Sequence, residues 1–315
     1  MTSLASFDPE THDKIMGRKG SHEKTLRGIE LMLRNDIIVS ANMVVSSHNI
    51  NQVYSTGIFA HSLGMNTFSA AQAVPSNSGG KMHLDQALIP EQVLDYLEDL
   101  NKVRNETGMF VRLTNPLPYC SVWESRPHLR YLVETSTCTA GRSIIQISPT
   151  GEVKPCPMVN NGYGNILEEG LDVVWERMSE WTEDKYVPES CQPCDLVEIC
   201  RGACRAEAER MVGSLDKKHP YSVKPIKLGE KEEDHLEVGT KLVTARDLKA
   251  REEREGVYVL FARDRYLVAS EGSARFISAV QAKNGITVDQ DLVNNKNAVK
   301  MISTALDSGI LLKTA

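Results

Sequence analysis

Apolar and polar positions follow one another along the first 114 residues in blocks that alternate between helical and strand periodicity. The expected helices cover 21–35, the stretch from Asn49 or Asn51 through His61, and the stretch after Pro90. The expected strands are 37–45, 67–71 and 109–113, each a short apolar run. Such alternation is typical of the α/β class, with a parallel sheet and helices packed on one face. The sequence starts inside what the pattern predicts as a first strand.

Residues 115–224 have a different pattern, with short segments, many turns and all seven cysteines. A β-hairpin over 144–153 is expected to deliver Cys156, and an amphipathic helix is expected over 171–181. We expect this region to be a separate small module folded around metal.

The charged stretch 227–237 contains GEKEEDHLE and predicts a solvated linker, placed at 225–239. After it, the chain predicts a small α+β unit over 240–315 with winged-helix proportions. Its expected elements are a hairpin of 257–261 and 266–269 and helices over 273–281 and 298–308, the last ending at Gly309.

Composition is ordinary, with 41% hydrophobic and 25% charged residues and a formal net charge of -6. Without a long basic run there is no electrostatic reason to expect nucleic acid or an anionic membrane as a partner. No apolar run approaches the length of a membrane span, and the polar start lacks a signal peptide's apolar core. We therefore predict a cytoplasmic protein, in which clustered thiols serve as metal ligands and not as disulfides.

Cysteine spacing carries the main functional signal. The order is C-x12-G-x4-C over Cys138, Gly151 and Cys156, and then C-x2-C-x5-C-x3-C over 191–204. Thiolates at such spacing suit tetrahedral zinc or an iron-sulfur cluster. Seven interleaved cysteines favour iron, and zinc remains the alternative.

With these residues in view, the chain resembles radical S-adenosylmethionine (SAM) enzymes that carry a SPASM domain. The cysteine series matches that domain's pattern, and Gly164-Asn165-Ile166 with Trp175 is similar to its GNI and Trp segment. Residues 1–114 resemble the second half of the family's partial TIM barrel, including the strand SANMVVSSHN. The resemblance implies SAM and auxiliary [4Fe-4S] clusters as cofactors, and a reducing donor such as flavodoxin or ferredoxin as a partner.

The chain departs from the family pattern in two places. Family members hold their catalytic cluster with a C-x3-C-x2-C loop, and the sequence contains no such triplet. The resemblance thus implies a chain truncated or naturally split from the enzyme's N-terminal third, which alone should not cleave SAM. The family pattern also ends in a cysteine after the one matching Cys204, where Ser222 is the nearest stand-in.

By analogy with the family, one auxiliary cluster would take Cys120, Cys138, Cys156 and Cys204. The other would take Cys191, Cys194 and Cys200, with Ser222, His219, a carboxylate, water or the substrate as fourth ligand. Cys120 lies outside the strict pattern and is otherwise a small buried hydrophobe.

Ser3 and Asn42 stand where family members place strand-end polar groups against SAM, although helix capping or turn formation is the ordinary role of such residues. Sulfatase-maturing relatives carry an acidic residue after one auxiliary-cluster cysteine. Pro157 follows Cys156 here, which disfavours that activity.

The C-terminal unit is similar, in the order of its elements, to the peptide-binding RiPP recognition element. An edge strand at 257–261 would accept a leader peptide by strand addition, with Phe276 and Ile277 forming pockets. A structural or DNA-binding winged helix is the alternative, and the interleaved acidic residues disfavour DNA.

The chain is therefore predicted to be part of a radical SAM/SPASM maturase that modifies a ribosomally made precursor peptide by hydrogen abstraction. The alternatives are a small-molecule or cofactor-biosynthesis radical SAM enzyme, a non-catalytic iron-sulfur partner subunit, and a zinc-stapled structural protein.

Overall fold

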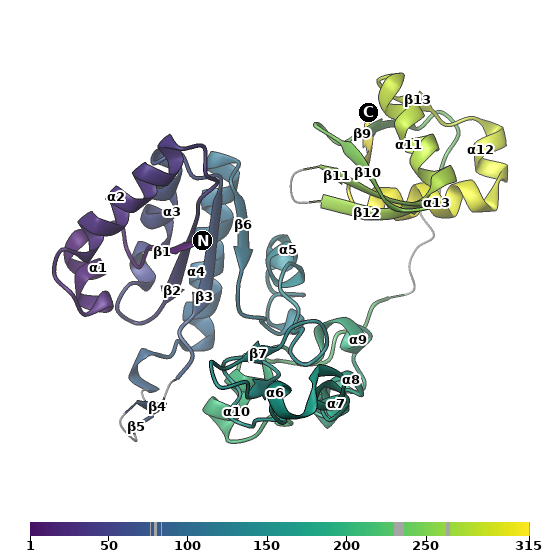
Figure 1. Cartoon of the computed structure of the whole chain (residues 1–315). Coiled ribbons are helices and arrows are strands. Elements are labelled where there is room, and N and C mark those ends of the chain that lie inside the picture. The colour runs from purple at the N-terminus through teal and green to yellow at the C-terminus, as the bar shows by residue number, and fades with distance from the viewer. Residues whose placement is uncertain (76, 79–80, 83, 230–235, 263–264, 315) are drawn as a thin grey trace. The chain divides into compact units, whose positions relative to one another are not determined.

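The computed structural model describes residues 1–75, 77–78, 81–82, 84–229, 236–262 and 265–314. The chain divides into two compact units, residues 1–227 and 228–315. Residues 230–235 of the predicted charged linker lie outside the described residues. Each unit is described by itself, with the labels of Figure 1.

A four-stranded parallel sheet forms the first part of unit one. Its order is β1 (Thr2–Ser3), β2 (Ser40–Val45), β3 (Thr67–Gln72) and β6 (Phe110–Leu113). Each neighbouring pair is parallel, and the four strands lie side by side in the order in which they occur in the sequence. The connecting helices are α1 (Pro9–Met16), α2 (Ser21–Arg34), α3 (Val53–Ser62) and α4 (Pro90–Thr107). The parallel sheet and the three predicted helices are confirmed.

Short elements fill the connections of this part. The 3-10 turns are Ile50–Gln52 and Leu84–Gln86, and β4 (Asn77–Ser78) pairs antiparallel with β5 (Lys81–Met82). The apolar pattern did not predict helix α1. Its N-cap is Asp8, whose carboxylate accepts from the Thr11 N–H at 2.8 Å, and its C-cap is the left-handed Gly17.

The predicted second strand begins three residues late. Asp36 adopts φ 55°, and the chain after it leaves Ile37 and Ile38 exposed, the latter at 90%. Strand β2 then starts at Ser40 and alternates, with Ala41, Met43 and Val45 buried against the helices. The predicted strand is therefore too long, since only residues 40–45 pair with a neighbour.

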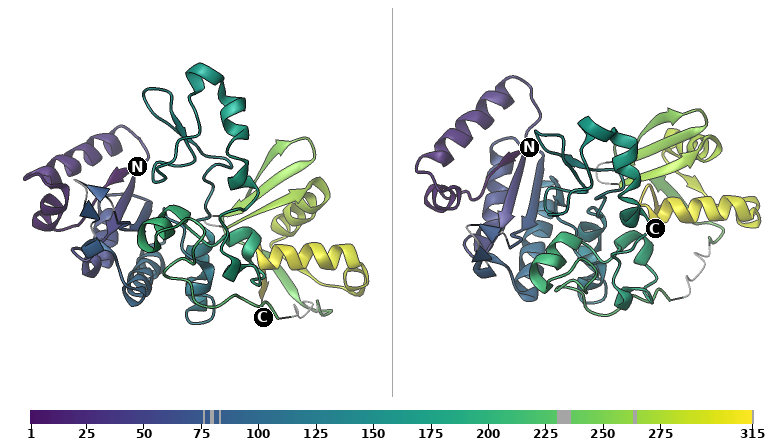
Figure 2. Two further views of the ribbon diagram at one scale, coloured as in Figure 1. Left: turned by 90° about the horizontal axis from the view of Figure 1, so that it is seen from below. Right: turned by 60° about the horizontal axis from the view of Figure 1, so that its bottom comes forward.

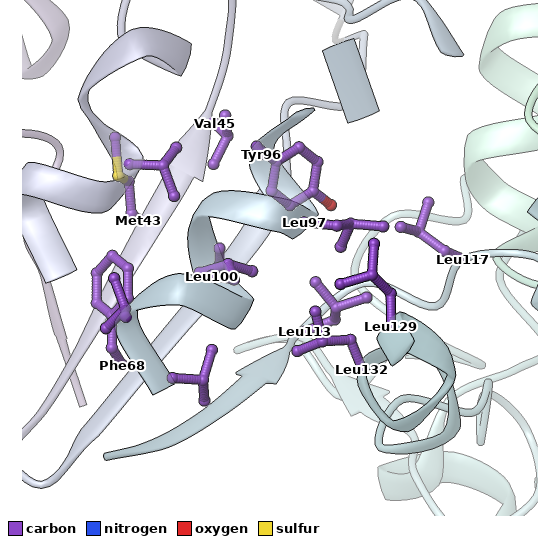
Figure 3. Packing of buried hydrophobic residues seen from close by; sticks show 14 of the residues in the cluster. Met43, Val45, Phe68, Tyr96, Leu97, Leu100, Leu113, Leu117, Leu129 and Leu132 are labelled. Carbon is purple, nitrogen blue, oxygen red and sulfur yellow. The ribbon is translucent and has the colours of Figure 1, made fainter. Parts of the chain in front are cut away.

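One hydrophobic core joins the sheet to the cysteine-rich segment (Figure 3). From α4, Leu100 points towards Met43 and Phe68 of the sheet, while Leu97 points towards Leu117 and Leu129 beyond β6. All six side chains are fully buried. Because this packing continues across residue 114, the cysteine-rich segment shares part of its hydrophobic core with the sheet.

The cysteine-rich segment is built from short elements, seen in teal and green in Figure 2. They are α5 (Arg130–Glu134), β7 (Gln146–Ile147), β8 (Val153–Lys154), α6 (Ile166–Glu169), α7 (Leu171–Glu176), α8 (Ser179–Thr182), α9 (Val197–Cys200) and α10 (Arg205–Val212), with 3-10 turns at Tyr119–Ser121, Pro127–Leu129 and Glu189–Cys191. The predicted hairpin is confirmed as β7 and β8. The predicted helix over 171–181 is wrong in its continuity, because the chain bends at Arg177 and Met178 between α7 and α8.

Unit two contains two three-stranded antiparallel sheets, in the orders β10-β11-β12 and β13-β9-β14. Its strands are β9 (Lys241–Thr244), β10 (Lys249–Arg254), β11 (Val257–Ala262), β12 (Arg265–Ser270), β13 (Ile286–Thr287) and β14 (Leu311–Thr314), and its helices are α11 (Glu271–Ala282), α12 (Gln290–Asn294) and α13 (Lys296–Asp307). The predicted hairpin and both predicted helices are present.

The predicted peptide-binding strand and pockets are wrong in detail. Strand β11 lies in the middle of its sheet, paired on both sides, so it has no free edge for strand addition. Ile277 is fully buried in the core of unit two and is not available to form a pocket.

Among the described residues, no helix has both the length and the apolar character that crossing a membrane would require.

Candidate metal centres

Four thiols surround one cavity of about 80 Å³. Cys120 follows β6, Cys191 and Cys194 lie on a turn closed by the Cys194 N–H to the Cys191 carbonyl at 2.9 Å, and Cys200 ends α9. All four line the cavity together with Ser222, whose hydroxyl oxygen is buried. We call Cys120, Cys191, Cys194 and Cys200 the four-thiol group.

The segment after Tyr221 directs backbone N–H groups at two of these sulfurs. The Val223 N–H donates to Cys120 Sγ and the Ile226 N–H donates to Cys194 Sγ, each at 3.4 Å. Burial raises the pKa of the Cys120 thiol, while the Val223 N–H and Ser222 lower it. Because such donors stabilise a thiolate over a thiol, the segment favours the ionised form that a metal requires.

Three thiols form a second group elsewhere in unit one. Cys204 is buried, and Cys138 and Cys156 pack against the same hydrophobic cluster, which includes Val153, Val174 and Trp181. Burial raises the pKa of the Cys204 thiol strongly, and nearby Glu207, Cys138 and Cys156 raise it further. We call Cys138, Cys156 and Cys204 the three-thiol group.

The partition differs from the predicted ligand sets at one residue. Cys120 packs with Cys194 and Cys200 against the core of the sheet, whereas the three-thiol group packs on its own hydrophobic cluster. Cys120 thus packs apart from Cys138, Cys156 and Cys204, with which the family analogy groups it. His219 does not line the four-thiol cavity; its Nε2 lies 3.4 Å from Glu207 Oε2, and both side chains are buried.

A left-handed turn separates the two groups. Between Cys200 and Cys204, Arg201, Gly202 and Ala203 have φ values of 49°, 74° and 68°. Positive φ is uncommon for residues other than glycine and persists only where the surroundings impose it. This turn allows two cysteines four positions apart to enter different groups.

The motif glycine of the C-x12-G-x4-C series has a specific steric role. Gly151 adopts φ 87°, and a Cβ there would lie 2.3 Å from Asn165 Oδ1. Asn165 donates to the Thr150 carbonyl at 2.8 Å and accepts from the Leu167 N–H at 2.9 Å, which caps α6. The GNI segment and the hairpin before Cys156 thus hold each other in place.

A buried cation lies close to both groups and was missed in the sequence. Arg205 is 4% exposed and donates to the carbonyls of Leu215 and Lys217 at 2.9 and 2.8 Å. Burial lowers the pKa of its guanidinium, and the thiols of Cys191, Cys204, Cys138 and Cys200 raise it. A positive charge at this place compensates the negative charge that ionised thiols of both groups would carry.

The three-thiol group lies beside the carboxyl end of the parallel sheet. Gln72, the last residue of β3, donates to Glu207 Oε2 at 2.7 Å and accepts from the Tyr96 hydroxyl at 3.1 Å, and all three are fully buried. Arg210 of α10 donates to the carbonyls of Pro75 and Met158 at 3.1 and 2.8 Å. Parallel sheets bind ligands beyond this end of their strands, so the thiols border the expected ligand site.

Ser3 and Asn42 lie side by side in the sheet. They are register partners, and the same row continues through Ser69 to Arg112. Ser3 ends β1, as expected, but Asn42 lies inside β2, three positions before its end, and its Oδ1 accepts from the Thr114 hydroxyl at 3.3 Å. Ser69 and Arg112 carried no sequence signal of their own, because their place in this row depends on strand pairing.

The four-thiol group offers a donor set that suits a thiolate-bound metal centre, because Cys120, Cys191, Cys194 and Cys200 all line one cavity. Four thiolates can hold a tetrahedral zinc ion or an iron-sulfur cluster. The residues by themselves therefore fit either kind of centre.

The comparison with protein families favours an iron-sulfur centre. The model of the SPASM iron-sulfur cluster-binding domain matches residues 138–195. The chain carries a SPASM domain. This match spans four of the seven cysteines, from Cys138 to Cys194, and confirms the resemblance on which the metal assignment rests.

Curated relatives that match about two thirds of the chain are radical SAM enzymes. An AdoMet-dependent heme synthase of Methanosarcina barkeri is 25% identical over 70% of this chain and 66% of its own length. A PqqA peptide cyclase of Xanthomonas oryzae pv. oryzae is 25% identical over 67% of this chain and 57% of its own. The chain thus spans less than two thirds of the length of these relatives.

The fold agrees with this relationship. The structure of native anSMEcpe with bound AdoMet has a TM-score of 0.53 and 18% identity, covering 70% of this chain and 62% of that one. At this identity the likeness shows a shared mixed α/β fold with a parallel sheet.

Proposed function

We propose that the chain supplies the auxiliary iron-sulfur part of a radical SAM maturase that modifies a ribosomally synthesised peptide. The observation that carries this proposal is the three-thiol group beside the carboxyl end of the parallel sheet, tied there by Gln72 and Glu207. In the proposed arrangement, residues 1–114 are the second half of a partial barrel and residues 115–224 are the SPASM region.

The cofactors would supply the redox chemistry, because SAM and an iron-sulfur cluster together generate a radical that abstracts hydrogen. The chain's own residues do the binding and positioning. The four-thiol and three-thiol groups would each hold one auxiliary [4Fe-4S] cluster, and Arg205 would compensate their charge. Ser3 and Asn42 are proposed to contact SAM from the polar row across the sheet.

Cleavage of SAM would additionally need a C-x3-C-x2-C segment, which the sequence does not contain. We therefore expect the chain alone to be inactive and to work with a segment of that kind. A reducing protein such as flavodoxin or ferredoxin is the proposed electron donor.

Unit two is proposed to bind the leader of the precursor peptide. Since β11 is central, strand addition would use the edge of β12, where Tyr266 and Val268 are 70% and 59% exposed. The opposite edge, β10, has the charged sequence KAREER, which suits an extended apolar segment less well.

A second candidate is a cofactor-biosynthesis enzyme acting on a small molecule. The specific observation in its favour is the match to a heme synthase over 70% of this chain. Binding of short peptides encoded beside the gene separates the two candidates, measured by fluorescence anisotropy on the full chain. Tight binding that is lost in Tyr266→Glu/Val268→Glu but kept in Leu312→Glu supports the peptide substrate.

The primary test is metal analysis of the full chain after purification and reconstitution without oxygen. We expect a brown protein with about eight irons and a matching amount of sulfide per chain. A colourless protein with stoichiometric zinc would overturn the redox function and leave a zinc-stapled structural protein.

A further inference from the structure

We propose that Cys120 is the fourth thiolate of the centre held by Cys191, Cys194 and Cys200. It takes the place that the family pattern gives to a cysteine near Ser222. The centre of Cys138, Cys156 and Cys204 is then one protein thiolate short and carries the exchangeable position. The inference rests on the proposed cluster-binding function and reverses the ligand sets that analogy alone gives.

The first support is convergence on a single cavity. Cys120 and Ser222 are about a hundred residues apart in sequence, yet both line the cavity formed by the other three thiols. A thiolate binds cluster iron far better than a hydroxyl does. Of these two side chains, Cys120 is therefore the one that completes the centre.

The second support is the backbone around the cavity. The Val223 and Ile226 N–H groups donate to the sulfurs of Cys120 and Cys194, so one segment serves both sulfurs. Cys120 thus receives the same kind of hydrogen bond as a cysteine of the C-x2-C pair. A cysteine buried only as a small hydrophobe would not need this donor.

The third support comes from the other centre. Cys138 borders a separate pocket of about 20 Å³, room for about one water molecule, lined also by Trp181, Arg142 and Arg205. Arg142 and Arg201 are both paired with Asp184 there, so the pocket's charge is partly compensated. A small monodentate ligand, water in the resting state, fits this position.

The test measures the effect of Cys120→Ser in a chain that retains only one of the two centres. Cys138→Ala/Cys156→Ala/Cys204→Ala removes the three-thiol group, and this variant should keep about four irons per chain. Adding Cys120→Ser should lower the iron content at least twofold and change the electron paramagnetic resonance (EPR) spectrum of the reduced protein. Adding Ser222→Cys as well should restore both, because its sulfur reaches the same cavity.

The matched control is Cys191→Ala/Cys194→Ala/Cys200→Ala, which retains the three-thiol group. Cys120→Ser should change neither its iron content nor its EPR spectrum. Cyanide, as a small exogenous ligand, should shift the EPR spectrum of this control variant and leave that of the Cys138/Cys156/Cys204 variant unchanged.

The inference is overturned if Cys120→Ser depletes iron in the control variant, or has no effect where Cys191, Cys194 and Cys200 remain. In that case the clusters are still present and the proposed function stands. If neither variant nor the wild-type chain binds iron, both the inference and the proposed function are wrong.

Discussion

The two thiol groups lie on either side of one short turn but have different surroundings. The four-thiol group lines a cavity beside the core of the sheet and receives backbone donors from 223–226. The three-thiol group is packed into its own hydrophobic cluster, with Cys204 only 7% exposed, and is tied to the end of β3. The difference teaches that cysteine spacing sets how many ligands are present, while long-range packing decides which of them act together.

The largest effect should come from Arg205→Met, because this guanidinium serves both groups. The substitution removes this donor from the buried carbonyl of Leu215 and the partly buried carbonyl of Lys217, and it removes the compensating charge. We expect a loss of about 3 kcal/mol or more in unfolding free energy, with iron lost from both groups. Urea unfolding and iron content measure this. The matched control is Arg177→Met, an exposed pair with Glu169, and should change neither.

Gln72→Leu should weaken iron binding by the three-thiol group and leave iron binding by the four-thiol group unchanged. It removes the donor to buried Glu207 and the acceptor of the Tyr96 hydroxyl, at an expected cost of about 2 kcal/mol. Iron retention during chelator challenge should fall at the three-thiol group and not at the four-thiol group, when each is assayed in the triple variant that isolates it. Equal loss of iron from the two groups would contradict the claim that only the three-thiol group is tied to β3 through Gln72 and Glu207. Exposed Asn35→Leu is the control.

Gly141→Ala adds a methyl group and tests how tightly the hydrophobic cluster around the three-thiol group is packed. Gly141 has φ 66°, and an added Cβ would lie 2.7 Å from the Trp181 side chain. We expect a cost of about 2 kcal/mol, since positive φ and overpacking act together. Gly17→Ala, with similar φ and open space around it, should cost less. Thermal melts of the two variants make the comparison, and equal losses would show that contact with Trp181 does not matter.

The smallest effect concerns acid stability near the same cluster. Burial alone would raise the pKa of Glu180, but hydrogen bonds from Lys185, Tyr163 and Tyr186 lower it from 4.5 to about 2. The folded state therefore gains stability from this carboxylate above pH 4.5 and loses it as pH falls towards about 2. Glu180→Gln should flatten that part of the stability profile, measured by urea unfolding at several pH values, whereas exposed Glu168→Gln should not.

Local pattern predicted most of the fold in unit one. The parallel sheet and α2, α3 and α4 follow from periodicity and from Gly and Pro punctuation, which are local signals. The start of β2 did not follow, because an exposed Ile37-Ile38 pair reads like a buried one in sequence. The break between α7 and α8 was missed for a related reason: Val174, Met178 and Trp181 are buried at helical spacing even though the helix is interrupted.

The candidate site was predictable in its ligands and not in their grouping. The spacing from Cys138 to Cys204 identifies a metal-binding region, and the SPASM match agrees. The grouping of Cys120 depends on a contact with residues 191–226, which no local pattern encodes. Arg205 and Glu207 were missed because a charged residue on a short helix is ordinarily exposed, and only the structure shows that both are buried.

The most direct test of two separate centres is Mössbauer quantification of iron in two triple variants. One lacks Cys138, Cys156 and Cys204, and the other lacks Cys191, Cys194 and Cys200. The structure predicts that each retains about four irons per chain in a single cluster. Loss of all iron from either variant would contradict the account, because it would mean that the seven thiols build one interdependent site.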